Sequence, residues 1–169
     1  LDNNEVLRRD SNLKFNLGDT YLDNLDEFDL IIKTPGIPFK GMDITSFRSK
    51  ITSELELFLK YISNTVIGIT GTKGKSTTSS LIYKIIKEQG KEVLLLGNIG
   101  VPLFDLVEDI KDETILVIEM SSHQLEYVTY SPNISILTNL FQEHLDHYNS
   151  YEEYIEAKIN IARYQNSSD

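Results

Sequence analysis

Short apolar runs bounded by polar residues, glycine or proline recur along the chain. They are rich in isoleucine, leucine and valine, which is typical of strands buried on both faces of a sheet. The runs predict strands over residues 29–34, 66–70, 92–96, 114–120 and 133–139. The first run is stopped by Pro35-Gly36-Ile37-Pro38, a sequence typical of a sharp turn.

Between these runs, apolar residues recur at the spacing of one helix face. This spacing predicts helices over residues 45–61, over the segment that follows Gly74 and ends at Gly90, and over 103–110 and 151–164. Because strands and helices alternate, we predict an α/β fold with parallel sheets and crossover helices. The polar stretch 1–28 is predicted to be the end of one α/β unit, and Ser63-Asn64-Thr65 a hinge between two domains.

Composition narrows the classes of function. The 169 residues are enough for one domain or parts of two, and the net charge of −10 argues against a general nucleic-acid or membrane-surface role. There is no cysteine, no apolar run long enough to insert into a membrane, and no export signal at the N-terminus. A cytoplasmic location is therefore expected. The start at Leu1 and the polar tail at 165–169 indicate an excerpt of a longer protein.

The strand at 66–70 runs into a glycine-rich turn that carries Gly71, Gly74, Lys75 and Ser76, and a helix follows. Converging backbone N–H groups and the start of a helix favour phosphate binding in such a turn. Lys75 is then expected to meet the β- and γ-phosphates, and the Ser76 hydroxyl to reach Mg²⁺. The Walker pattern asks for glycine where this chain has Ile69, so the loop is a variant. The alternative is a turn that binds nothing.

Polar side chains follow each of the later strands. They are Asn98, Glu119 with Ser121, and His144 with Asp146. Because the carboxyl ends of parallel strands share one edge of a sheet, these groups are expected to converge on the phosphate loop. Glu119 is predicted to be a Mg²⁺ ligand, since hard cations prefer oxygen.

For other polar residues, the sequence pattern alone does not decide between a structural and a functional role. His144 is as readily a structural histidine as a functional one, His147 is expected to be structural, and His123 is undecided. Lys158 lies in a helical pattern and is expected to be a solvated lysine. The turn at 35–38 is either a plain turn or a ligand loop at a strand end.

These residues together resemble the Mur ligase family of peptidoglycan synthesis. The family loop, Gly-Thr-x-Gly-Lys-Ser/Thr, is here Gly71-Thr72-Lys73-Gly74-Lys75-Ser76, which accounts for the departure from Walker spacing. Four further segments favour the member that adds D-glutamate over its sister ligases. They are Thr34-Pro-Gly-Ile-Pro38, Gly97-Asn-Ile-Gly-Val-Pro102, Glu119-Met-Ser-Ser-His-Gln-Leu-Glu126 and Glu143-His-Leu-Asp-His-Tyr148.

The resemblance implies a division into parts of two domains. Residues 1–62 are expected to be the rear part of a Rossmann-like N-terminal domain that holds the uridine nucleotide. Residues 63–169 are expected to be the first part of a central P-loop ATPase domain. A third, C-terminal domain that brings the amino acid is expected to be missing from this sequence, so that the fragment alone is inactive.

The resemblance also implies a reaction and its residues. ATP is expected to phosphorylate the carboxylate of UDP-N-acetylmuramoyl-L-alanine, after which the amine of D-glutamate forms the amide. The implied ATP-binding residues are Gly71, Thr72, Lys73, Gly74, Lys75, Ser76 and Thr77. The implied metal ligands are Ser76, Glu119, His144 and Lys158, the last as a carbamylated lysine. The implied catalytic residues are Lys75, Glu119, His144 and Lys158. The implied substrate contacts are Thr34, Gly36, Asn98, Ser121, Gln124 and His144.

Two other functions remain open from the sequence. One is a relative that adds glutamate to another carboxylate, as folyl- or polyglutamate synthases do, although the segments at 34–38 and 97–100 count against it. The other is a module that binds Mg-nucleotide without ligating anything.

Overall fold

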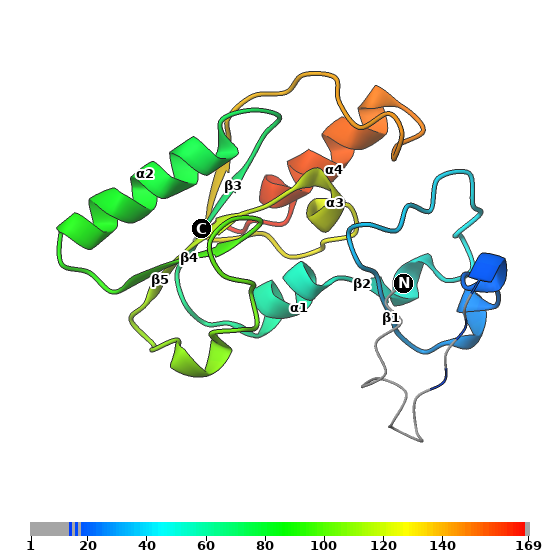
Figure 1. Ribbon diagram of the computed structural model, residues 1–169, viewed down its shortest axis with the longest axis horizontal. Helices are drawn as coiled ribbons and strands as arrows, with labels where there is room; N and C mark the ends of the chain where they lie inside the picture. Colours follow the sequence, from blue (N-terminus) through cyan, green and yellow to red (C-terminus); the bar gives the residue numbers. More distant parts are fainter. Residues whose placement is uncertain (1–13, 15, 17, 168–169) are drawn as a thin grey trace.

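The computed structural model describes residues 14, 16 and 18–167, and in them the chain forms two sheets (Figure 1). The smaller sheet pairs β1 (Ile31–Ile32) with β2 (Ile51–Thr52). The larger sheet has the order β4 (Val93–Gly97), β5 (Ile115–Glu119), β3 (Val66–Thr70), β6 (Ile134–Leu137). All of these pairs are parallel, which confirms the α/β fold predicted from the alternation.

Helices cover both faces of the larger sheet. Successive side chains of β3 and β5 point alternately to one face and to the other. One face packs against α2 (Lys75–Glu88), the predicted helix after the phosphate loop, whose Ile82 and Ile86 meet Ile67, Ile69 and Val117. The opposite face packs against three helices. They are α1 (Glu54–Tyr61), α3 (Ser122–Leu125) and α4 (Tyr151–Arg163). The central strands β3 and β5 are therefore buried on both sides, as their apolar runs require, whereas the edge strand β6 leaves Ile134 and Leu137 exposed.

The N-terminal part of the described chain has a small core of its own. Phe39, Phe47 and Ile51 are buried together with Ile31 of β1, and Tyr127, which follows α3, packs against them. Helix α1 instead contributes Leu55, Phe58 and Leu59 to the core of the larger sheet. The boundary expected at 63–65 stays a prediction, and α1, which precedes it, packs with the sheet that follows it.

The helix predicted over 45–61 is wrong in its first half. Residues 48–50 form a short 3₁₀ turn, and residues 51 and 52 form β2, which pairs with β1. Helix α1 begins only after Ser53, whose side chain accepts a 3.1 Å hydrogen bond from the backbone of Glu56. The β-branched Ile51 and Thr52 are thus held by a pairing partner twenty residues away in sequence, a contact that local spacing does not reveal.

The helix predicted over 103–110 is also wrong. This segment consists of turns closed by bonds between residues three apart, such as Asp109 N to Leu106 O at 2.9 Å, with a 3₁₀ helix only at Val107–Asp109. Leu103, Leu106 and Ile110 still reach the core, so the apolar spacing reflected burial without an α-helix. Conversely, α3 was not predicted, although Ser121 and Gln124 carry the spacing of a capping box.

About half of the predicted α/β end at residues 1–28 lies outside the described residues. Its described part contains two 3₁₀ turns, at Gly18–Thr20 and Leu25–Glu27. No helix in the described ranges combines the length and the apolar character needed to cross a membrane.

Candidate active site

The glycine-rich turn that is predicted to bind phosphate, called the phosphate turn below, lies between β3 and the start of α2, the position expected from the sequence. Gly71 has a φ of 144° and Gly74 a φ of 83°, values that side chains rarely allow. At Gly71 a β-carbon would also collide with the hydroxyl of Thr138. The turn is fastened to the segment after β6, since Asn139 accepts hydrogen bonds from the backbone of Thr72 at 3.0 Å and of Lys73 at 2.9 Å. These bonds fix the shape of the turn.

Lys75 opens helix α2 and folds back over the turn. Its Nζ donates to the carbonyl oxygens of Gly71 at 2.9 Å and Thr72 at 3.1 Å. The neighbouring Ser76 and Thr77 are exposed at the first turn of this 14-residue helix. The helix N-terminus, its hydroxyl groups and a lysine that donates to backbone carbonyls together suit a polyphosphate.

Lys158 of α4 is buried, and the expectation of a solvated lysine is wrong. Only 2% of the residue is exposed. Its Nζ donates to Gly71 O at 2.8 Å and lies 3.4 Å from Thr70 Oγ1, and 5.0 Å from the centre of the Tyr154 ring. Burial, and next the charge of Lys75, lower the pKa of Lys158 to about 8. Roughly a tenth of such an amine is neutral at pH 7, a far larger share than for an ordinary lysine.

Glu119 ends β5 next to β3 and is 1% exposed. The side-chain amide of Asn98 donates to its Oε1 at 3.0 Å, while its Oε2 is buried and has no hydrogen-bond partner in the described chain. A buried carboxylate oxygen without a partner is costly unless a cation or donor meets it. Glu119 thus fits the predicted role of a Mg²⁺ ligand. Within the described ranges, no three His, Asp or Glu side chains are grouped so that they alone could hold a metal ion.

The three histidines lie together beside this site. His144 is partly exposed, with a φ of 60° that is unusual for a residue other than glycine. The ring of His123 lies 4.8 Å from that of His144 and 4.2 Å from that of His147, measured between centroids. Burial, then the charges of His147 and His144, lower the pKa of His123 to about 4, so His123 is neutral at pH 7. His147 is buried and donates to Glu126 at 3.0 Å.

Other predicted residues are placed less centrally. Thr34 and Gly36 are exposed on the turn after β1. Ser121 and Gln124 cap helix α3 reciprocally, through bonds of 3.2 Å and 2.9 Å between side chain and backbone. Both side chains therefore have a structural partner already, and any ligand contact must use their remaining donors and acceptors.

The structure links the phosphate turn to the His144 segment through two residues that sequence reasoning missed. Tyr154 is fully buried, and its hydroxyl lies 2.8 Å from the hydroxyl of Thr72. Glu143 accepts a 2.7 Å bond from Lys73, which lowers the pKa of Glu143. Tyr154 precedes Lys158 by one helical turn, and this spacing was the available signal.

The structure therefore places the predicted residues in three neighbouring groups at the carboxyl ends of the strands of the larger sheet. Lys75 and Lys158 meet at the Gly71 carbonyl, Asn98 holds Glu119 at the end of the neighbouring strand, and His144 lies on the segment fastened to the turn. No hydrogen bond in the described part of the chain joins Thr34 or Gly36 to these groups.

Comparison with known proteins gives consistent matches. The family model described as the Mur ligase middle domain matches residues 69–169. The chain is 44% identical over 160 residues to the UDP-N-acetylmuramoylalanine--D-glutamate ligase of Acetivibrio thermocellus, covering 93% of this chain and 34% of that protein. It is 42% identical over 170 residues to the protein of the same name from Clostridium kluyveri, covering 98% and 37%. The chain thus spans about a third of the length of these relatives.

Among solved structures, the chain is similar to the UDP-N-acetylmuramate:L-alanyl-gamma-D-glutamyl-meso-diaminopimelate ligase of Neisseria meningitides. The identity is 19% and the TM-score 0.48, over 76% of this chain and 46% of that one.

Proposed function

Because this chain belongs to the Mur ligase family, we propose that it is part of an ATP-dependent ligase that adds D-glutamate to UDP-N-acetylmuramoyl-L-alanine. Residues 1–62 are assigned to the rear of the uridine-binding domain and residues 63–169 to the first part of the ATP-binding domain. The names of the relatives that are 42–44% identical support the choice of substrates. A cytoplasmic location is part of the proposal, because ATP is available there.

The observation that carries the proposal is the meeting of Lys75 and Lys158 at the carbonyl of Gly71. The amino group of Lys75 supplies positive charge where an anionic carboxylate must approach the anionic γ-phosphate, and Lys158, once carbamylated, would hold a Mg²⁺ ion at the same turn. The amino group of Lys75 is held at this turn by two backbone carbonyls. We assign to Lys75 the β- and γ-phosphates of ATP, and to the turn from Gly71 to Thr77 the rest of the polyphosphate.

The reaction has two steps. A carboxylate oxygen of the L-alanyl group attacks the γ-phosphorus, and the bond to ADP breaks. The amine of D-glutamate then attacks the activated carbonyl carbon, loses a proton and expels phosphate, which leaves an amide. The residues of this chain position the reacting groups and stabilise charge, as phosphoryl transfer requires.

The residues assigned to Mg²⁺ are Ser76 and Glu119 for one ion, and His144 and Lys158 for a second. The unpartnered Oε2 of Glu119 supports the first assignment. Mg²⁺ held by these residues would supply positive charge that offsets the charge of the phosphates.

Lys158 is assigned to carbamylation, in which its neutral amine adds to CO₂, forms an N–C bond and releases a proton. The pKa of about 8 supports this assignment, since only the neutral amine reacts. The product is an anion that suits a hard cation, whereas the free ammonium group repels one.

The uridine-linked substrate is assigned to Thr34, Gly36, Asn98, Ser121, Gln124 and His144. Asn98 uses its amide nitrogen to hold Glu119, and Gln124 uses its amide oxygen to cap α3. The remaining carbonyl of Asn98 and amide nitrogen of Gln124 are the atoms we assign to substrate contact.

The test is an amide-forming assay on a chain extended at both ends to the length of the relatives. With ATP, Mg²⁺, UDP-N-acetylmuramoyl-L-alanine and D-glutamate, we expect stoichiometric ADP, phosphate and a product heavier by one glutamyl residue. L-Glutamate is the matched control and should give no product. A folded extended chain that binds ATP but forms no product from this pair, or forms product from a folate, contradicts the proposal.

A further inference from the structure

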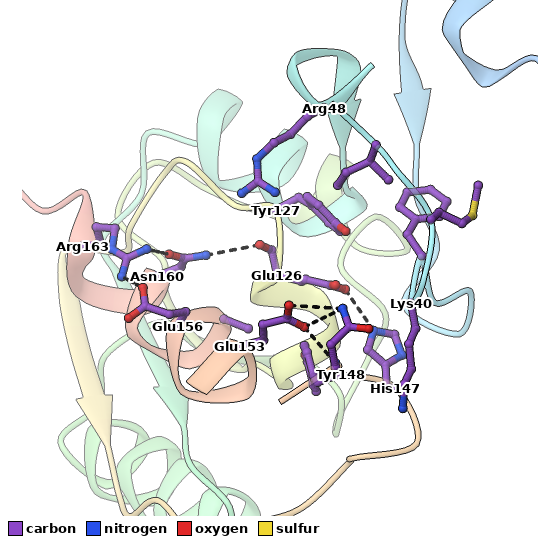
Figure 2. Close-up of a pocket in the computed structure, with 15 residues that line it drawn as sticks. Lys40, Arg48, Glu126, Tyr127, His147, Tyr148, Glu153, Glu156, Asn160 and Arg163 are labelled. Carbon is purple, nitrogen blue, oxygen red and sulfur yellow. Dashed lines mark hydrogen bonds and ion pairs between the residues drawn. The ribbon is translucent and has the colours of Figure 1, made fainter. Parts of the chain in front are cut away.

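A cluster of titratable side chains that are mostly buried lies beside the candidate site without a role in it. It consists of Lys33, Glu126 and His147. The Oε2 atom of Glu126 lies 3.2 Å from Nζ of Lys33 and 3.0 Å from Nε2 of His147. The side chains of Lys33 and His147 are at least nine-tenths buried, and that of Glu126 is 17% exposed. Figure 2 shows Glu126 and His147 facing each other at one side of a cavity of about 410 Å³. One carboxylate oxygen thus serves two partners.

The three residues come from three separate segments. Lys33 follows β1 and directly precedes the Thr34–Gly36 turn. Glu126 ends α3, the helix capped by Ser121. His147 lies three residues after His144. The cluster therefore connects the turn on the smaller sheet to the His144 segment on the larger one.

The backbone at Glu126 is held by helix α4, which packs on the larger sheet. The side-chain amide of Asn160, on α4, donates to the carbonyl oxygens of Leu125 at 2.9 Å and Glu126 at 3.4 Å. The carboxylate of Glu126 therefore has a fixed position at the end of α3, and the position of Lys33 depends on it.

Lys33 has strong physical reasons to remain there. Its ammonium group lies 5.6 Å from the centre of the Phe39 ring and 5.5 Å from that of Tyr127. In such a buried, aromatic environment a cation requires a carboxylate partner. The backbone of Lys33 also donates to Thr52 O at 2.8 Å, so its position fixes the chain that enters the turn.

The His144 segment is held from the same carboxylate. The backbone N–H groups of His147 and Tyr148 both donate to the carbonyl of His144, at 3.0 Å and 3.1 Å. His144 itself has a left-handed backbone, which persists only where the surroundings hold it. The bond between His147 and Glu126 anchors the end of this turn.

We propose that Glu126 is a positioning residue that holds the Thr34–Gly36 turn and the His144 turn at a fixed separation, so that one uridine-linked substrate reaches both. That the substrate reaches both turns rests on the proposed function. That Glu126 fixes the separation of the two turns is testable without any substrate.

The first test is amide hydrogen exchange in this chain, comparing wild type, Glu126→Gln and the control Glu92→Gln, which removes an exposed carboxylate paired with Lys111. In Glu126→Gln we expect exchange at the amides of Lys33, Ile37, His147 and Tyr148 to rise about tenfold, while β3 and β5 keep their protection. Glu92→Gln should match wild type. A rise confined to one of the two turns, or an equal rise throughout the sheet, overturns the coupling.

A second variant guards against a Glu126→Gln chain that fails to fold. Lys33→Met keeps the bond between Glu126 and His147 and removes only the other arm of the cluster. We expect faster exchange at Lys33 and Ile37 positions but unchanged exchange at His147 and Tyr148. If Lys33→Met speeds amide exchange at His147 as much as at Ile37, the bonds of Glu126 to Lys33 and to His147 do not act separately, and this part of the proposal is contradicted.

The substrate half is tested by binding to the extended chain. We expect Glu126→Gln to weaken the binding of UDP-N-acetylmuramoyl-L-alanine about tenfold and to leave the binding of Mg²⁺·ATP unchanged, and Glu126→Asp to recover part of the loss. Equal losses for both ligands indicate a merely structural role and overturn it. If the wild-type extended chain does not bind the uridine-linked substrate, the proposed function fails, and the exchange result alone decides the coupling.

Discussion

The Nζ atom of Lys158 donates a 2.8 Å hydrogen bond to the carbonyl oxygen of Gly71. This bond joins helix α4, near the end of the described chain, to the turn between β3 and α2 (Figure 1). Lys75 donates to the same oxygen from the other side of the turn. The carbonyl of Gly71 is thus the point at which the predicted phosphate-binding and carbamylated lysines meet.

The conformation of Gly71 makes it intolerant of any side chain. We expect Gly71→Ala to lower the free energy of unfolding by about 1–3 kcal/mol, because a β-carbon would combine backbone strain with a collision against Thr138. Urea unfolding measures the change. Gly36→Ala is the control, since its β-carbon would meet nothing within 4 Å. Equal stability of the two variants would contradict the role of Gly71.

Tyr154 is expected to support the turn through its hydroxyl. Tyr154→Phe removes the 2.8 Å contact with Thr72 and should cost about 1 kcal/mol of stability, together with a weaker affinity for Mg²⁺·ATP. Thermal unfolding and calorimetric titration report the two effects. Tyr61→Phe alters a tyrosine that is 77% exposed and should change neither quantity. An unchanged nucleotide affinity in Tyr154→Phe would show that the turn does not depend on this contact.

Burial of Lys158 predicts a pH-dependent stability. Its pKa is lowered to about 8, so between pH 8 and the unfolded value near 10.4 the unfolded state holds the proton that the folded state has released. Stability therefore rises with pH over this range, by at most about 3 kcal/mol relative to Lys158→Met. Urea unfolding of both proteins at several pH values tests this. Curves that stay parallel would place the pKa of Lys158 at its ordinary value.

Glu119 is expected to link Mg²⁺ to stability. Glu119→Gln removes a buried charge whose Oε2 lacks a partner in the described chain, so stability without Mg²⁺ should be unchanged or higher. Mg²⁺ with ATP should raise the melting temperature of wild type and leave that of Glu119→Gln unmoved. Glu108→Gln, which alters an exposed carboxylate on the 3₁₀ turn at Val107–Asp109, is the control and should respond as wild type does. An equal response of Glu119→Gln would remove Glu119 from the metal site.

Local patterns were enough to predict much of the fold. The strands β3, β5 and β6, helix α2 and helix α4 lie within the predicted ranges or close to them, because each carries its own apolar period and stop signal. The glycines of the phosphate turn were also visible, since their conformations are demanded by the turn itself.

Long-range contacts account for what the sequence did not reveal. Lys158 looks like a solvated lysine until α4 is packed against β3, and only the resemblance to the Mur ligases gave it a role. Strand β2 was read as helix because its partner, β1, is distant in the chain. The links from Glu126 to Lys33 and His147 likewise join three segments whose proximity no spacing rule predicts.

The most direct measurement of the central claim is calorimetric titration of Mg²⁺·ATP into this chain, into Lys75→Ala and into the control Lys84→Ala, whose lysine is exposed on the same helix. We expect binding that requires Mg²⁺, is retained in Lys84→Ala and is lost in Lys75→Ala, because the amino group of Lys75 lies on the turn whereas that of Lys84 is exposed further along the helix. If all three proteins are folded by circular dichroism and none binds, or if Lys75→Ala binds as wild type does, the turn between β3 and α2 is not the nucleotide site of this chain.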